Sequence, residues 1–240
     1  MPVTPHKALV LAAGLGLRMR PLTDTMPKPL VRVAGRPLLD HVLDRLADAG
    51  CTEAVVNVHY LPDQIIEHTA TREHPRVVIS DERDQVLGTG GGVVKALPLL
   101  GSEPFFHVNS DTMWIEGVRQ NLLRLADAFD PAIMDILLLM APTATSIGYS
   151  GRGDYAMLAD GTLRKRREHQ VVPFVYAGAA IMSPAIFEGA PAGEFSLTKM
   201  FDKANEQERL YGLRLEGVWM HVGTPDAVAE AEEALLESAA

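Results

Sequence analysis

Hydrophobic positions in the first half of the chain follow two alternating patterns. Short runs that are apolar at consecutive positions, such as Ala8–Ala13, are typical of strands buried on both faces. Between these runs, apolar residues recur every three or four positions, as they do on one face of a helix. The patterns predict strands at Ala8–Ala13, Ala54–Val58, Val77–Ser80, Phe105–Val108 and Ile136–Met140, and helices at Pro37–Ala49, Pro62–Thr71, Gly91–Leu97 and around Gly117–Phe129.

This alternation of strands and helices predicts the fold class. Strands that alternate with helices form a sheet of mainly parallel strands, with helices packed on both faces. We therefore expect a Rossmann-like three-layer α/β/α fold around a mixed, mainly parallel central sheet. Ligands of such folds bind beyond the carboxyl ends of the strands.

The pattern changes from about Thr143 onward, where glycines interrupt shorter runs. We expect one domain over residues 1–240, with a first half at about 1–142 and a smaller subdomain at about 143–240 on the same sheet. In the second half we predict strands at Tyr155–Leu158, Thr162–Arg166 and Phe174–Met182, a strand pair within Leu213–Val222, and helices at Leu197–Gln207 and Pro225–Glu237.

Composition narrows the class of protein. The formal net charge of −9 argues against a nucleic-acid partner, which would need a basic face. No apolar run approaches the roughly 20 residues of a membrane-spanning helix, and the N-terminus does not have the pattern of a signal peptide. We therefore expect a cytoplasmic protein with no membrane partner. Cys51 is the only cysteine, which excludes an internal disulfide framework.

The segment Leu9–Leu30 carries the strongest chemical signal. Its apolar run ends in a turn with Gly14 and Gly16, followed by Arg18 and by Lys28 between two prolines. Glycines let backbone amides approach an anion closely, and successive amides form anion-binding concavities. The turn lacks the third glycine of a dinucleotide fingerprint and the ending of a P-loop. It predicts a site for a ligand with several phosphates.

Two further motifs lie where predicted strands end. Leu87–Gly92 reads LGTGGG, which is either a tight turn before a helix or a loop that binds a ligand. Asp111 follows the strand that begins at Phe105. A carboxylate there is a candidate ligand for Mg²⁺, which takes hard oxygen ligands, and its alternative role is to cap the following turn.

Together these motifs resemble the signature of the sugar-1-phosphate nucleotidyltransferases, G-x-G-x-R-x-x-P-x-T followed by P-K-P. Every fixed position is filled, by Gly14, Gly16, Arg18, Pro21, Thr23, Pro27, Lys28 and Pro29. The resemblance implies a fold of the nucleotide-diphospho-sugar transferase type, with a nucleotide-binding first half and a sugar-phosphate-binding second half. It also implies that a sugar 1-phosphate oxygen attacks the α-phosphorus of a nucleoside triphosphate and that pyrophosphate leaves. Such a reaction depends mainly on positioning and charge stabilisation.

The resemblance also implies roles for single residues. Arg18, Lys28 and Asp111 are the expected catalytic residues: Arg18 holds the pyrophosphate, Lys28 bridges the α-phosphate and the sugar phosphate, and Asp111 ligates Mg²⁺. Arginine suits a diphosphate, whereas lysine acts as a compact charge. Thr89 and Gly90 are expected at the base edge. The full set of expected nucleotide-binding residues is Leu11, Ala12, Ala13, Gly14, Gly16, Arg18, Lys28, Glu82, Thr89 and Gly90.

The expected sugar-phosphate site carries a looser signal. Lys165 lies in the charged run Leu163–Glu168, where many relatives keep an E-K pair, and Arg166 is an equal candidate. Solvated surface charge is the alternative explanation of this run. The segment Phe195–Leu197 is also expected to border the acceptor. The expected sugar-phosphate-binding residues are Asn109, Gly153, Asp154, Lys165 and Gly178.

His221 is a departure from the family pattern. Relatives place a second metal-binding aspartate in a W-x-D-V-G-T segment, which here reads Trp219-Met220-His221-Val222-Gly223-Thr224. Imidazole is a poor ligand for Mg²⁺ and a better one for Mn²⁺ or Zn²⁺. Three interpretations remain: Mg²⁺ is held by Asp111 while His221 only hydrogen-bonds nearby, a softer metal such as Mn²⁺ is preferred, or catalysis is impaired.

Within the family, the chain is most similar to the compact uridylyltransferases that act on N-acetylmuramate 1-phosphate in cell-wall sugar recycling. The shared features are the length, the run Thr89–Leu100 and the Gly151–Asp154 block. Mannose-1-phosphate guanylyltransferases are the second candidate. A non-catalytic nucleotide-binding paralogue is the third, and His221 is its only support. The sequence does not decide the oligomeric state.

Overall fold

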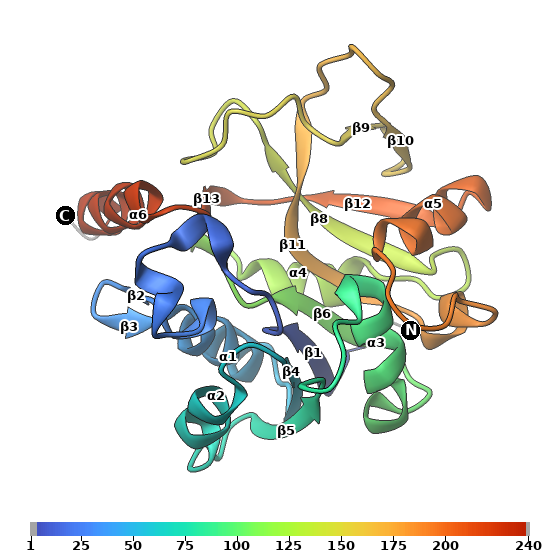
Figure 1. Cartoon of the computed structure of the whole chain (residues 1–240). Helices are drawn as coiled ribbons and strands as arrows, with labels where there is room; N and C mark the ends of the chain where they lie inside the picture. Colours follow the sequence, from blue (N-terminus) through green and yellow to red (C-terminus); the bar gives the residue numbers. More distant parts are fainter. Residues whose placement is uncertain (1–3, 239–240) are drawn as a thin grey trace.

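A computed structural model describes residues 4–238 (Figure 1). Its centre is a nine-stranded mixed sheet in the order β10-β9-β11-β6-β1-β4-β5, with β8 beside β11 and β12 beside β8. The four strands β6, β1, β4 and β5 are parallel, β12 is parallel to β8, and β11 runs antiparallel to both β6 and β8. The strands are β1 (Lys7–Leu11), β4 (Glu53–Val58), β5 (Arg76–Asp81), β6 (Phe105–Asn109), β8 (Ile136–Pro142), β9 (Tyr155–Met157), β10 (Leu163–Lys165), β11 (Phe174–Met182) and β12 (Leu210–Arg214).

Helices pack on both faces of this sheet. One face is covered by α1 (Leu38–Asp48), α2 (Pro62–Thr69) and α4 (Asn121–Ala128), and the other by α3 (Gly88–Leu100) and α5 (Thr198–Glu206). Strand β1 carries apolar side chains on both faces of the sheet, so both faces need a layer of helices to cover them. Ala8 and Val10 belong to the core under the first group of helices, and Leu9 belongs to the core under the second. The predicted three-layer fold is confirmed.

A third, smaller core lies beside the sheet. It joins the ribbon of β7 (Thr112–Glu116) and β13 (Gly217–His221), the hairpin of β2 (Arg32–Val33) and β3 (Arg36–Pro37), and the last helix α6 (Pro225–Ser238). Met113 and Met220 are buried there.

The sequence prediction was wrong about these strands in two ways. It missed β2, β3 and β7, and it paired the two strands within Leu213–Val222 with each other. In the structure β12 pairs with β8 and β13 pairs with β7. The segment before α4 is occupied by β7 and a turn, so α4 begins at Asn121, later than predicted. The division of the chain near residue 142 stays a prediction.

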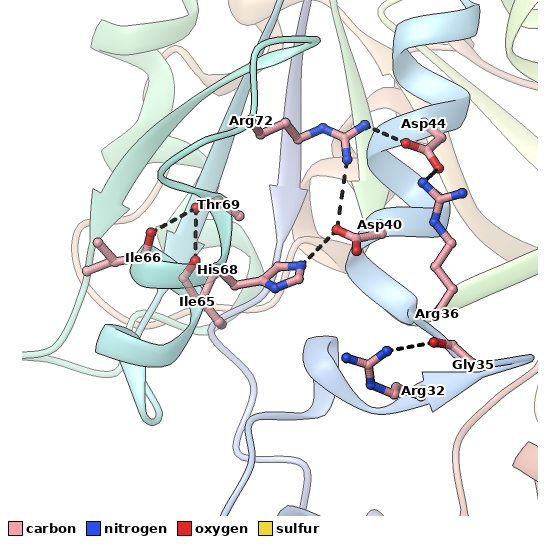
Figure 2. A network of polar contacts seen from close by, with 10 residues as sticks. All are labelled: Arg32, Gly35, Arg36, Asp40, Asp44, Ile65, Ile66, His68, Thr69 and Arg72. Carbon is pink, nitrogen blue, oxygen red and sulfur yellow. Dashed lines mark hydrogen bonds and ion pairs between the residues drawn. The ribbon is translucent and has the colours of Figure 1, made fainter.

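Charged residues tie α1 to α2 on the first face (Figure 2). Arg72, just after α2, donates to Asp44 of α1 at 2.6 Å, and its guanidinium lies 3.8 Å from the Asp40 carboxylate. His68 is 2.9 Å from the same Asp40, and Arg36 pairs with Asp44 from the other side. These ion pairs and hydrogen bonds link α1 to the end of α2.

Two further observations concern the single cysteine and the lengths of the helices. Cys51 is buried, and its burial raises the thiol pKa to about 12, which fits a small apolar side chain rather than a reactive one. Among residues 4–238, no helix is both long enough and apolar enough to cross a membrane.

Candidate active site

The signature segment, by which we mean Leu9–Leu30, begins in β1 and continues beyond the carboxyl end of that strand. It then forms three short 3₁₀ turns, η1 (Leu17–Met19), η2 (Leu22–Asp24) and η3 (Lys28–Leu30). Gly16 precedes η1 in a left-handed conformation, φ 64°, which suits glycine. Its carbonyl accepts hydrogen bonds from the Thr23 hydroxyl at 2.8 Å and the Met19 N–H at 2.9 Å. A Cβ on Gly16 would lie 3.2 Å from Cβ of Lys28. The turn is therefore packed against the residue expected to touch the phosphates.

A cavity of about 300 Å³, the nucleotide-side cavity, lies beyond the carboxyl ends of β1, β4, β5 and β6. The location agrees with the rule for open α/β sheets. Gly16, Gly90 and Arg18 are not among the residues that line it. The predicted residues that do line it are Leu11, Ala12, Ala13, Gly14, Lys28, Glu82, Thr89, Asn109 and Asp111.

A buried polar chain forms one wall of this cavity. The Ala12 N–H donates to Asn57 Oδ1 at 2.7 Å, and Asn57 Nδ2 donates to Glu82 Oε1 at 2.9 Å. His59 Nδ1 donates to the Glu82 carbonyl at 2.7 Å. Burial raises the pKa of Glu82, while the hydrogen bond from Asn57 opposes that shift. Sequence reasoning missed Asn57 and His59; the signal was polar side chains at the end of an otherwise apolar strand.

Lys28 and Asp111, which both line the nucleotide-side cavity, form an ion pair. Lys28 Nζ lies 2.5 Å from Asp111 Oδ2, although the two residues are far apart in the sequence. Their side chains are 12% and 31% exposed, so the pair is only partly screened by water. The structure therefore brings together two of the three residues predicted to be catalytic.

A second cavity of about 300 Å³, the acceptor-side cavity, adjoins the first and shares Asn109 and Asp111 with it. Arg18, the third predicted catalytic residue, lines this second cavity and not the first. Sequence reasoning missed its aromatic walls. The lining residues are Arg18, Asn109, Asp111, Thr112, Tyr149, Asp154, Val175, Tyr176, Ala177, Gly178, Trp219 and His221.

His221 faces the same space as Asp111, as the sequence predicted. Its ring lies 5.6 Å from that of Trp219 and 6.5 Å, edge-on, from that of Tyr149. A Cβ on Gly223 would lie 2.7 Å from His221 Nε2, so that glycine leaves room for the imidazole. Burial lowers the His221 pKa, Asp111 opposes the shift, and Lys28 and Arg18 add to it. The imidazole is therefore neutral at pH 7.

Gly178 lies at an irregularity in β11 where the register shifts against β8. Its φ is 82°, and a Cβ there would lie 3.1 Å from both Asn109 Nδ2 and Cβ of Thr112. The Trp219 indole N–H donates to the Thr112 hydroxyl at 3.0 Å and to the Ala177 carbonyl at 3.1 Å. The predicted residues Asn109 and Gly178 therefore lie next to each other, and both line the acceptor-side cavity.

Gly153 and Asp154 have clear structural partners. The Gly153 N–H donates to the Tyr149 hydroxyl at 3.0 Å, and a Cβ on this glycine would overlap the Val172 carbonyl. Asp154 Oδ2 accepts the Tyr176 N–H at 2.9 Å. Asp154 still lines the acceptor-side cavity, whereas Gly153 does not.

Lys165, a candidate for the sugar phosphate, is paired with a carboxylate and lines a different cavity from Asp111. Its ammonium contacts both carboxylate oxygens of Asp202, at 2.6 and 2.8 Å. It lines a third cavity of about 190 Å³ together with Arg166, Asp154 and Tyr176. Arg166 Nε donates to the Gly153 carbonyl at 3.0 Å. Neither cation lines either of the two cavities that contain Asp111, so the role of both at the sugar phosphate stays a prediction.

The donor set around Asp111 bears on a metal ion. Over residues 4–238 there is no cluster of three or more acidic, histidine or cysteine side chains that would enclose a metal. Asp111 offers one hard carboxylate between the two cavities, and His221 offers one neutral imidazole. Mg²⁺ in phosphate-transferring sites often has only one or two protein carboxylates, with phosphates and waters as its other ligands. The residues present fit that arrangement.

Comparison with known proteins identifies the family of this chain. A family model described as a MobA-like NTP transferase domain matches residues 8–145, more than half of the chain. The chain belongs to the MobA-like NTP transferase family. The matched residues include the signature segment, the glycines after Leu87 and Asp111, so the family predicted from the sequence is confirmed.

Two relatives of this MobA-like transferase are similar over most of its length. It is 46% identical to an N-acetylmuramate alpha-1-phosphate uridylyltransferase of Caulobacter vibrioides, over 99% of this chain and 100% of that protein. It is 30% identical to the mannose-1-phosphate guanylyltransferase catalytic subunit beta of Drosophila pseudoobscura pseudoobscura, over 91% of this chain but 59% of that protein. A solved structure, UDP-glucose pyrophosphorylase complexed with UDP-glucose, has a TM-score of 0.78 at 19% identity, over 97% of this chain and 98% of that one. That likeness supports the fold.

Proposed function

We propose that this protein transfers the uridylyl group of UTP to N-acetylmuramate 1-phosphate, giving the UDP-sugar and pyrophosphate. The observation that carries the proposal is 46% identity over the whole length of a relative with that activity in its name. The two adjoining cavities, which share Asn109 and Asp111, provide separate places for a nucleotide and an acceptor.

The reaction needs a nucleophile and a leaving group in line. An oxygen of the sugar 1-phosphate forms a bond to the α-phosphorus of UTP while the bond to the pyrophosphate oxygen breaks. Lys28 lines the nucleotide-side cavity and contacts Asp111, which lines both cavities, so its ammonium is placed to stabilise charge on the α-phosphate and near the sugar phosphate. Gly14 and its neighbours present backbone to the triphosphate. The family resemblance assigns the pyrophosphate to Arg18, but Arg18 lines the acceptor-side cavity and not the nucleotide-side one, so this role stays a prediction. None of these steps needs a covalent intermediate on the protein.

We also propose that Mg²⁺ binds at Asp111. The ion would neutralise phosphate charge, and Asp111 and His221 are the residues that would lie beside it. When substrates and metal bind, Lys28 would contact a phosphate and Asp111 would contact the metal, so the ion pair between them would be broken. Mn²⁺ remains an alternative because of the imidazole at position 221.

Two other functions deserve a test. A mannose-1-phosphate guanylyltransferase is a more distant candidate, because that relative is 30% identical and this chain covers 59% of it. A non-catalytic nucleotide-binding paralogue is supported only by His221. A cytoplasmic location stays a prediction.

The deciding experiment measures pyrophosphate release for UTP and GTP, each with N-acetylmuramate 1-phosphate, N-acetylglucosamine 1-phosphate and mannose 1-phosphate, under Mg²⁺ and Mn²⁺. We expect the highest kcat/KM for UTP with N-acetylmuramate 1-phosphate. Preference for GTP with mannose 1-phosphate would favour the guanylyltransferase. Nucleotide binding without turnover of any pair would favour the paralogue.

A further inference from the structure

The segment Gly193–Leu197 lies directly against the glycine loop, by which we mean Leu87–Gly92, the residue before α3 and the first turn of that helix. The Phe195 N–H donates to the Leu87 carbonyl at 3.1 Å, and the Gly90 N–H donates to the Phe195 carbonyl at 2.8 Å. The Leu197 N–H donates to the Thr89 hydroxyl at 2.9 Å. Three hydrogen bonds thus connect two short segments that are far apart in the sequence.

Steric contacts confirm how close this approach is. A Cβ on Gly90 would overlap the ring of Phe195, and one on Gly91 would overlap the Gly193 carbonyl. A Cβ on Gly88 would lie 2.8 Å from the Phe195 carbonyl oxygen. Phe195 itself is only 5% exposed. The glycines of this loop therefore make room for protein.

This packing changes what the loop can offer a nucleobase. Thr89 and Gly90 were expected at the base edge, but the Gly90 N–H already donates to the Phe195 carbonyl. The Thr89 hydroxyl accepts from the Leu197 N–H, which fixes its position and leaves its own O–H as a donor. Leu87, Gly88 and Thr89 still line the nucleotide-side cavity. The 193–197 segment therefore contacts the loop from outside the cavity, and the cavity wall depends on it.

The same segment continues into α5, which borders the acceptor side. Thr198 and Phe201 line the third cavity with Tyr176, and the Phe201 and Tyr176 rings pack edge to face with centroids 5.4 Å apart. Tyr176 also lines the acceptor-side cavity. One short stretch of chain thus contacts the glycine loop at one end and leads to the acceptor wall at the other.

We propose that Phe195 is a positioning residue for base recognition: with its neighbour Leu197 it fixes the shape of the glycine loop that the nucleobase contacts. Phe195 acts on Leu87 and Gly90, and Leu197 acts on Thr89. The proposal rests on the proposed function, in that the nucleotide-side cavity receives the base of UTP. Phe195 does not line that cavity, so its effect on the nucleotide is indirect.

The test compares binding of UTP with binding of inorganic tripolyphosphate to the full chain by calorimetry. Tripolyphosphate has the phosphates without the base, so the ratio of the two affinities measures what the base contributes. Phe195→Leu should weaken UTP binding about tenfold and leave tripolyphosphate binding within about twofold, because the loop is misplaced while the signature segment is not. In turnover, KM for UTP should rise by a similar factor while kcat changes less.

Matched variants separate positioning from general packing. Phe187→Leu makes the same change at another 5%-exposed phenylalanine of the same hydrophobic core, and it should leave the affinity ratio unchanged. Thr89→Val keeps the side-chain shape but loses the acceptor for Leu197, so the ratio should fall about three- to tenfold, whereas Thr89→Ser should keep it. The Thr89 pair also carries the test if Phe195→Leu does not fold.

Several results would overturn the inference. Equal losses for UTP and tripolyphosphate in Phe195→Leu would show a merely structural role, as would an equal change of the ratio in Phe187→Leu. Wild-type protein that binds UTP no tighter than tripolyphosphate would also overturn it. Failure of the proposed function is a separate result, because it is the absence of wild-type turnover with UTP and N-acetylmuramate 1-phosphate.

Discussion

The turn at Gly14–Gly16 and the loop at Gly88–Gly92 both follow parallel strands and both border the nucleotide-side cavity, but the space around their backbones differs. A Cβ on Gly14 would meet no protein atom within 4 Å. A Cβ on Gly90 or Gly91 would overlap the 193–197 segment, and one on Gly92 would lie 2.8 Å from Asn57 Nδ2.

This difference separates two reasons for glycine in a binding site. Around Gly14 the open space is available to a ligand, so a side chain there would compete with the triphosphate. Around Gly90 the space is filled by protein, so a side chain there would disturb the fold first and the ligand second. Gly16 lies between these cases, because it combines a left-handed backbone with contact to Lys28.

The largest expected effect is a loss of catalytic activity when Lys28 of the signature segment is replaced. Lys28→Met keeps the length of the side chain but removes the charge between the two phosphates. It also leaves Asp111 without its cation. We expect kcat/KM for pyrophosphate release to fall roughly 1,000-fold, about 4 kcal/mol of transition-state stabilisation. Lys199→Met, at an exposed lysine of α5, is the control and should stay near wild type. A loss below tenfold for Lys28→Met would contradict the central role of this lysine.

The next largest expected effect is a loss of folding stability when a methyl group is added in the glycine loop. Gly90→Ala gains about 1 kcal/mol of helix propensity but forces a methyl group into the ring of Phe195. We expect a net destabilisation of about 2 kcal/mol, measured as the free energy of unfolding in urea. The double variant Gly90→Ala/Phe195→Leu should recover part of that loss, because the smaller side chain relieves the overlap. Fully additive losses would show that the overlap is not the cause.

The sequence predicted the parts of this molecule that are encoded locally. The signature segment holds its glycines and Lys28 within one short stretch, so its resemblance to a family and its place after β1 could both be predicted. The partners of the glycine loop could not, because Phe195 and Gly193 lie far from it in the sequence and contact it only through the tertiary fold. The β7–β13 ribbon and the pairing of Lys165 with Asp202 were missed for the same reason.

A smaller and opposite effect is expected at Gly14. Gly14→Ala should change the free energy of unfolding by less than about 0.5 kcal/mol, since the added methyl meets no protein atom. Binding of inorganic tripolyphosphate should nevertheless weaken about tenfold, because the methyl group occupies the approach of an anion to the backbone amides. Calorimetry on this variant beside Gly90→Ala gives the comparison directly. If Gly14→Ala lost stability instead, the two glycine segments would not differ as argued.

The smallest expected effect concerns His221, which lies outside both glycine segments and lines the acceptor-side cavity with Asp111. His221→Asp places a second carboxylate near Asp111, in a pocket where Gly223 already leaves room for the larger imidazole. If Asp111 holds Mg²⁺ and His221 only hydrogen-bonds nearby, kcat should stay within about threefold and half-maximal activity should need about threefold less Mg²⁺. His221→Asn, similar in size but uncharged, is the matched control and should not lower the Mg²⁺ requirement. A loss above tenfold in His221→Asp would show that the imidazole has a specific role, and it would favour a softer metal at this site.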